Sequence, residues 1–137
     1  MANEFSIMTV VGAVTIALVY ISAFSFVREP LRKTINALII AGAGGVYWSG
    51  GLGVWEFPFG PLMFYLAYRG LTDYKYIAIG WLCHTGWDVV HHLYARPIVQ
   101  FVPSSSAGCA ICDALLAIWF FYQAPPITTW FKSNKFV

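Results

Sequence analysis

Five long apolar stretches, separated by short polar segments, make up most of this 137-residue chain. The first covers residues 5–27 and contains no charged side chain, and the others cover residues 34–50, 52–68, 76–94 and 105–123. A helix rises ~1.5 Å per residue and a bilayer core is about 30 Å thick, so stretches of this length are typical of membrane-spanning helices. The pattern predicts an all-α, polytopic membrane protein in which five transmembrane helices form a single domain.

Smaller features inside these stretches predict how the helices pack and bend. Pro58 and Pro61 fall in the first half of the third stretch and are expected to kink that helix. The serines of residues 104–106 are expected to cap the start of the fifth helix. Small residues recur at every fourth position of the second stretch, which predicts a face for close helix packing, formed by Ala37, Ala41, Gly45 and Ser49.

Composition favours the membrane interpretation. Hydrophobic residues make up 59% of the chain and charged residues only 10%, with a mean hydropathy of +0.67. A soluble domain carries about 25% charged residues, so a soluble protein of this composition would have almost no polar surface. The net charge of +2 is spread over several loops. We therefore expect membrane lipid as a partner and no nucleic acid.

The distribution of basic residues predicts the orientation in the membrane. With five spans, one side of the membrane receives the loops after the first and third spans and the C-terminal tail. These segments contain seven of the eight basic residues, namely Arg28, Arg32, Lys33, Arg69, Lys75, Lys132 and Lys135. The other side receives Arg96 alone. Because basic residues accumulate in cytoplasmic loops, we predict that the N-terminus is outside and the C-terminus is cytoplasmic.

The fourth stretch contains all three histidines of the chain together with an aspartate. At about 100° per residue, His84, Asp88 and His91 fall within about 60° of one another, and His92 lies next to that face. Ionisable side chains are costly inside a bilayer, so a cluster of them in a membrane helix indicates a functional site.

The predicted topology brings further polar residues to the same depth. Glu56 opens the third span, and Cys109, Cys112 and Asp113 lie near the start of the fifth, so all should occupy the outer half of the bilayer. Imidazole, carboxylate and thiolate are the usual ligands of zinc and copper, and we expect one of these metals as the cofactor. The predicted ligands are His84, Asp88, His91 and Asp113, with His92, Cys109 and Cys112 as second choices. Glu56 is the predicted general acid or base.

Three functions fit these residues. The first is a membrane metalloenzyme that acts on a lipid-like or amphipathic substrate. The second is a non-catalytic protein, either an accessory subunit of a larger membrane complex or a metal-handling protein, possible also as a homo-oligomer. The third is a thiol oxidoreductase that uses the Cys109 and Cys112 pair, although Cys83 is the only other cysteine and such enzymes relay electrons through a second pair. An intramembrane polar network that only packs helices together is the non-functional alternative.

Two motifs resemble a small family of bacterial integral-membrane proteins of unknown function. They are W-x2-H-T-x-W-D-x2-H-H, which begins at Trp81, and S-S-x-G-C-A-I-C-D, which begins at Ser105. The resemblance implies a helical fold in the bacterial inner membrane and brings no established activity. The run from Asp88 to His92 is similar to the H-x2-H-H box of membrane di-iron desaturases, with Asp88 in place of the first histidine. Those enzymes use about eight histidines and this chain has three.

Overall fold

The computed structural model describes residues 6–49 and 51–130, and every regular element within them is helical. The long helices are α1 (Ile7–Ser25), α2 (Leu31–Val46), α3 (Glu56–Gly70), α4 (Tyr74–Leu93) and α5 (Ser105–Phe121). Three short elements join or follow them, η1 (Tyr47–Ser49), η2 (Gly53–Trp55) and α6 (Ile127–Trp130). The predicted all-α fold class is confirmed.

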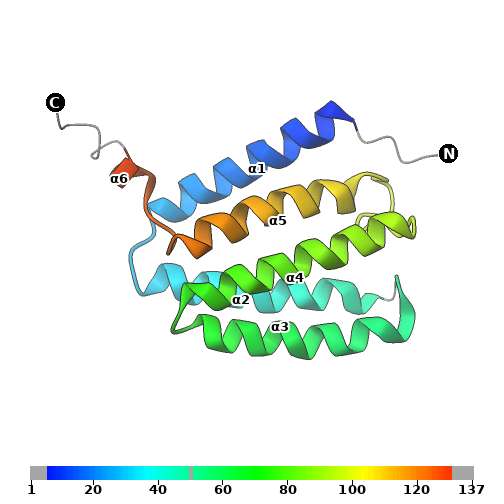
Figure 1. Cartoon of the computed structure of the whole chain (residues 1–137), viewed down its shortest axis with the longest axis horizontal. Helices are drawn as coiled ribbons and strands as arrows, with labels where there is room; N and C mark the ends of the chain where they lie inside the picture. Colours follow the sequence, from blue (N-terminus) through cyan, green and yellow to red (C-terminus); the bar gives the residue numbers. More distant parts are fainter. Residues whose placement is uncertain (1–5, 50, 131–137) are drawn as a thin grey trace.

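The long helices form a bundle in which α4 and α5 are the central pair (Figure 1). Helix α1 packs on α5 at one edge, and α3 lies at the other edge, where it packs on α2 and α4. The α1–α2 and α3–α4 connections lie at one end of the bundle together with α6. The α2–α3 and α4–α5 connections lie at the opposite end, which receives the start of α3, the end of α4 and the start of α5.

Proline and glycine shift two helix boundaries from their predicted positions. Helix α2 begins at Leu31 rather than residue 34, because Pro30 takes the N-cap position, where its missing N–H is not needed. Helix α3 begins at Glu56 rather than residue 52, because Gly53–Trp55 form a separate 3₁₀ turn (η2) that starts at the positive φ of Gly53. Pro58 therefore lies in the first turn, where it removes no intrahelical hydrogen bond, and Pro61 alone lies in the helix interior. The kink stays a prediction.

The packing face of α2 is rotated from the predicted one. Its buried side passes through Ala37, Ile40 and Gly44, whereas Ala41 and Gly45 are partly exposed. A Cβ atom at residue 44 would lie 2.5 Å from Cβ of Met63, so glycine is what lets α2 approach α3 there. The fourth member of the predicted stripe, Ser49, has a side chain outside the described part of the structure.

The serines at the start of α5 anchor a loop instead of capping the helix. Ser104 occupies the N-cap position but makes no side-chain capping bond. Ser105 Oγ accepts a hydrogen bond from the Val99 N–H at 3.0 Å, and Ser106 Oγ accepts one from the Ile98 N–H at 3.2 Å. The capping prediction was therefore wrong. These bonds hold the 95–104 loop against the bundle, near His91.

The bundle has an apolar outer surface and a hydrophobic core that includes a small set of buried polar residues. Large apolar side chains point outward from each long helix, for example Val19, Leu38, Phe57, Leu82 and Ile118. The buried polar residues are Arg32, Asn36, Glu56, His84, Asp88, His91, Ser106 and Asp113. Among the described helices, α1 is the one that is long and apolar enough to cross a membrane by length and composition, and α5 is apolar but shorter. The number of spans and their orientation remain predictions.

Candidate metal centre and acid–base pair

Helix α4 presents its polar residues on the face that packs inside the bundle. His84, Asp88 and His91 are separated by four and three residues, which places them one above the other on a helix, and all three are buried. The prediction that they share a face is confirmed. Neighbouring elements bring Asp113 from α5, Glu56 from α3 and Tyr47 from η1 toward the same face.

Three of these side chains converge on one point and can hold a metal ion. His84 Nδ1 lies 2.7 Å from Asp113 Oδ2 and 3.2 Å from Asp88 Oδ2. Ligand atoms of His84, Asp88 and Asp113 all lie within 4.8 Å of one another, and all three residues are buried. This is the one such group of three or more ligands found among the described residues.

The surroundings of the group suit metal binding. The second ring nitrogen of His84, Nε2, lies 3.3 Å from the carbonyl oxygen of Ala43, and the Tyr47 hydroxyl donates a hydrogen bond to Asp88 Oδ1. Metal-binding histidines typically donate their other N–H to a backbone carbonyl, which fixes the ring and the tautomer. With Nε2 held in this way, Nδ1 is the atom that faces the two carboxylates.

Aromatic rings enclose the group on one side. The Tyr47 ring lies between the two buried histidines, with its centroid 4.9 Å from that of His84 and 4.8 Å from that of His91. Phe59 meets Tyr47 edge-on at 5.3 Å and stacks on Trp87 at 5.0 Å. Such a wall lowers the local dielectric constant and strengthens the electrostatic interactions inside it.

A second polar pair lies beside the first group. His91 Nε2 is 3.0 Å from Glu56 Oε1, and His91 Nδ1 is 2.9 Å from the carbonyl oxygen of Arg96. Glu56 Oε1 also accepts a hydrogen bond from the Leu52 N–H at 3.0 Å. A Cβ atom at Gly51 would lie 2.6 Å from His91 Cε1, so the chain must carry glycine where it crosses this pair.

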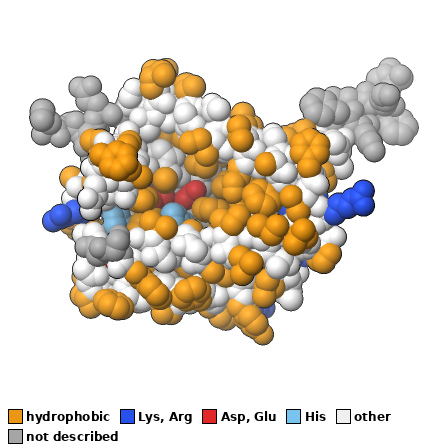
Figure 2. Space-filling view, turned by 180° about the vertical axis from the view of Figure 1, so that it is seen from behind, with side chains coloured by type: hydrophobic (Ala, Val, Ile, Leu, Met, Phe, Trp, Pro, Cys, Tyr) orange, Lys and Arg blue, Asp and Glu red, His pale blue; other side chains and the backbone are white. Residues whose placement is uncertain are grey.

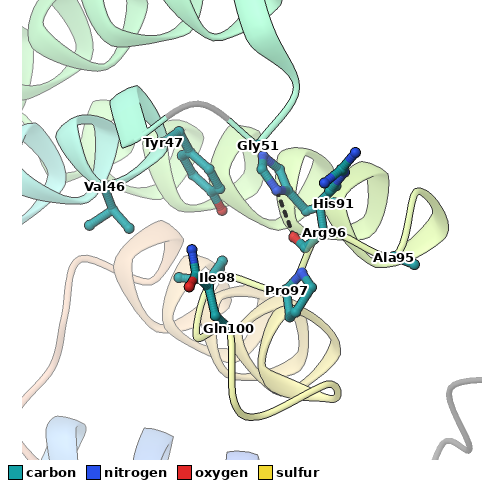
Figure 3. A pocket seen from close by; sticks show the side chains of 9 residues that line it. All are labelled: Val46, Tyr47, Gly51, His91, Ala95, Arg96, Pro97, Ile98 and Gln100. Carbon is teal, nitrogen blue, oxygen red and sulfur yellow. Dashed lines mark hydrogen bonds between the residues drawn. The ribbon is translucent and has the colours of Figure 1, made fainter.

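A cavity of about 290 Å³ reaches this pair from the loop end of the bundle. Figure 3 shows Tyr47 and His91 on one side of it and the 95–100 loop on the other, with the Tyr47 hydroxyl turned toward Ile98 and Gln100. Arg96 and Gln100, at the outer side, are exposed. The cavity therefore connects the buried polar residues with the surface at the loop end.

The remaining predicted ligands lie apart from the three-residue group. His92 points to another face of α4, where it borders an apolar cleft with Val89 and Ala110. Cys109 and Cys112 are free, partly buried thiols that line a groove together with Asp113. The structure pairs His91 with Glu56 rather than with the His84 group.

Sequence reasoning overlooked Tyr47, which contacts both histidines and Asp88. The signal was present, since residues 37, 40, 44 and 47 follow the spacing of one helix face and carry alanine, isoleucine, glycine and tyrosine. An aromatic residue with a hydroxyl at the end of a buried face is expected to reach a polar partner. The sequence did not indicate that the carbonyl groups of Ala43 and Arg96 would contact the two histidines, because backbone partners depend on the fold.

Fold and site together define the class of protein: an all-helical bundle with a buried histidine–aspartate group and an adjoining histidine–glutamate pair. The chain belongs to a family of unknown function (DUF6010), whose pattern matches residues 8–126. No curated protein and no solved structure matches it significantly. The family match contains every residue of the candidate site and assigns no activity to it.

Proposed function

We propose that this protein is an integral membrane metalloenzyme that hydrolyses an amphipathic substrate, with its metal held by His84, Asp88 and Asp113. The observation that carries the proposal is the convergence of these three buried side chains inside a bundle with apolar outer faces. Two carboxylates buried together repel each other, and taking them out of water is costly. A divalent cation bound between them would offset both effects.

The membrane placement rests on the apolar outer surface of the bundle. Extended apolar patches on a protein surface mark contact with lipid or with another protein, and here large apolar side chains are exposed on every long helix. Five described basic residues, Arg28, Arg32, Lys33, Arg69 and Lys75, flank one end of the helices, and Arg96 is at the other end. Figure 2 shows basic side chains toward the two ends and apolar ones between them. We therefore retain five spans, with the start of α1 outside and the site in the outer half of the bilayer.

Zinc is the metal that these ligands favour. They supply one imidazole nitrogen and two carboxylate oxygens, while the softer thiols of Cys109 and Cys112 lie outside the group. Copper(I) would prefer the thiols. Of the two metals expected from the sequence, we therefore propose zinc. Bound zinc would supply a hydroxide ion near neutral pH, the nucleophile of metal-dependent hydrolysis.

Glu56 and His91 have the geometry to hold and move a proton. Both ring nitrogens of His91 face oxygen atoms, the Arg96 carbonyl and the Glu56 carboxyl group. Because a carbonyl oxygen can only accept, Nδ1 carries a hydrogen, which leaves Nε2, 3.0 Å from Glu56 Oε1, as the nitrogen that can exchange a proton with Glu56. We assign this pair the acid–base role, with the adjoining cavity supplying water.

Elemental analysis of the protein purified in detergent without chelator tests the proposal. We expect one zinc ion per chain, with sharply lower occupancy in His84→Ala, Asp88→Asn and Asp113→Asn. His92→Ala is the matched histidine control, since His92 is on the same helix but outside the group. Asp73→Asn is the matched aspartate control, because Asp73 caps α4 and asparagine caps equally well.

The proposal also predicts how metal binding depends on pH. Zinc binding should weaken as pH falls, because imidazole and carboxylate must lose their protons to coordinate. A folded protein that binds no metal at any pH would rule out the metalloenzyme. Co-migration of that metal-free protein with other membrane proteins on native gels would then support the accessory-subunit function.

A further inference from the structure

A groove between α1 and α5 leads to the candidate metal centre from the side of the bundle. Its volume is about 330 Å³, and its walls include Met8 and Ile16 of α1 and Val102 of the preceding loop. Cys109, Cys112 and Asp113 form its α5 side. Apart from Asp113, none of the residues that line it carries a charge.

Asp113 joins this groove to the site. Its carboxyl group borders the groove and lies 2.7 Å from His84 Nδ1, although the residue is only 5% exposed. Figure 2 shows acidic and histidine side chains at the bottom of a hollow beneath α1, bordered by apolar side chains. Helix α1 packs mainly on α5 and α6 and meets α2 at Tyr20, whose hydroxyl donates a hydrogen bond to Asn36, whereas the groove lies along residues 8–16 of α1.

The site therefore has two access routes of opposite chemistry. The cavity at the loop end reaches Tyr47 and His91 past the exposed side chains of Arg96 and Gln100. The groove beside α1 reaches Asp113 past apolar side chains and, in the proposed orientation, opens toward the acyl chains of the outer leaflet. A substrate that fits both routes has an apolar chain and a polar group at one end of it.

We infer that the substrate is a membrane lipid whose acyl chain occupies the α1–α5 groove, with the polar end of that chain at Asp113. The inference rests on the proposed function, since it names the substrate class of the same site. Water would reach the polar end through the loop-end cavity, and the lipid would reach it laterally without leaving the bilayer. This arrangement would let the protein bind a chain that is insoluble in water.

Protection of the thiols tests the inference on the unmodified protein. Purified protein in detergent is treated with a small thiol reagent while lysophosphatidylcholine, a single-chain lipid, is added in increasing amounts. We expect labelling of Cys109 and Cys112 to fall several-fold as the lipid binds. Cys83 is the internal control, because it is partly exposed on α4 and does not border the groove. Equal protection of all three cysteines, or of none, would overturn the inference.

Two glycines allow a second test that does not depend on the thiols. A Cβ atom at Gly12, in the groove, or at Gly42, on α2 away from it, would meet nothing within 4 Å, so a side chain can be introduced at either position. Gly12→Leu should reduce crosslinking of a lysophosphatidylcholine with a photoreactive chain end several-fold, and Gly42→Leu should not. Equal crosslinking in the two variants would show that the lipid coats the bundle without entering the groove.

These tests separate the inference from the proposed function. Lipid protection and crosslinking are repeated on His84→Ala, which should lack the metal. Groove binding that persists in that variant supports the inference whatever the metal analysis shows. A metal-loaded wild-type protein with no selective protection of Cys109 and Cys112 would retain the metal site and reject the lipid substrate.

Discussion

The two buried histidines are each fixed by a backbone carbonyl group and each turned toward acids. His84 is held through Nε2 by Ala43, and His91 through Nδ1 by Arg96. The free nitrogens therefore differ, with Nδ1 of His84 facing two aspartates and Nε2 of His91 facing Glu56. This difference is the reason for assigning a ligand role to His84 and a proton-transfer role to His91.

Removal of the Tyr47 hydroxyl should weaken metal binding while the bundle stays folded. Tyr47→Phe deletes the hydrogen bond to Asp88 but keeps the ring contacts with both histidines. Loss of a partner that orients a metal ligand costs about 10- to 100-fold in affinity. Competition with a chelator measures the effect, and Tyr122→Phe, at an exposed position, is the control. Unchanged affinity would show that Asp88 needs no orienting partner.

A side chain at residue 51 should displace His91. In Gly51→Ala the new Cβ would lie 2.6 Å from His91 Cε1 and 3.3 Å from Glu56 Oε1. Crowding of this kind costs about 1–3 kcal/mol of stability. We expect a lower midpoint of thermal unfolding and loss of the proposed hydrolytic activity. Gly86→Ala, where a Cβ meets nothing within 4 Å, should leave both unchanged, and equal behaviour of the two variants would contradict the assigned packing.

Much of the site could be predicted at the residue scale, since helical spacing alone placed His84, Asp88 and His91 on one face. It could not reveal that Asp113 would approach His84 while Cys109, one turn earlier on α5, would not. That selection depends on the rotation of α5 against α4. Helical spacing gives the relative directions of residues on one helix, and only packing gives the direction of one helix toward another.

At the scale of the elements, apolar length predicted the five long helices but not all of their ends. The ends of α2 and α3 depend on Pro30 and on the glycines before Glu56, whose local effects override the length of the apolar stretch. The small-residue face of α2 was misjudged because the sequence offers glycines at 42, 44 and 45, and spacing alone does not rank them. The structure selects Gly44, which faces Met63.

Substitution of Gly44 should weaken the packing of α2 on α3, whereas substitution of the neighbouring Gly45 should not. In Gly44→Ala the new Cβ would lie 2.5 Å from Met63 Cβ, so the two helices must separate or Met63 must move. We expect destabilisation of about 1–3 kcal/mol. Gly45→Ala places a Cβ in open space and should not destabilise the protein. Unfolding in increasing denaturing detergent compares the two variants, and the reverse order would support the originally predicted face.

At the scale of the whole molecule, the polar site lies away from the end of the bundle that carries most basic residues. Glu56 at the start of α3 and His91 near the end of α4 lie toward one end, and His84 and Asp113 lie near the middle of α4 and α5. The α1–α2 and α3–α4 connections bring the basic residues to the other end. Lys132 and Lys135, which were counted for the orientation, lie outside the described residues. The five described basic residues of that end still outnumber Arg96.

Reporter fusions test the orientation. A reporter active only outside the cytoplasm should be active when inserted in the loop of residues 96–103 and silent when fused at the C-terminus. The reason is that cytoplasmic segments are enriched in basic residues. Introducing three lysines into the 96–103 loop should weaken or reverse this pattern of reporter activity. The opposite pattern in the unmodified protein would place the site in the cytoplasmic half of the bilayer.

The most direct test of the central claim is the X-ray absorption spectrum of the purified protein at the zinc edge. We predict a first shell of nitrogen and oxygen atoms only, at about 2.0–2.2 Å, which His84, Asp88 and Asp113 would supply with water. The signal should disappear in Asp113→Asn and persist in Cys109→Ser. A sulfur atom at about 2.3 Å in the first shell would contradict the assigned ligands and place the metal on the cysteines of α5.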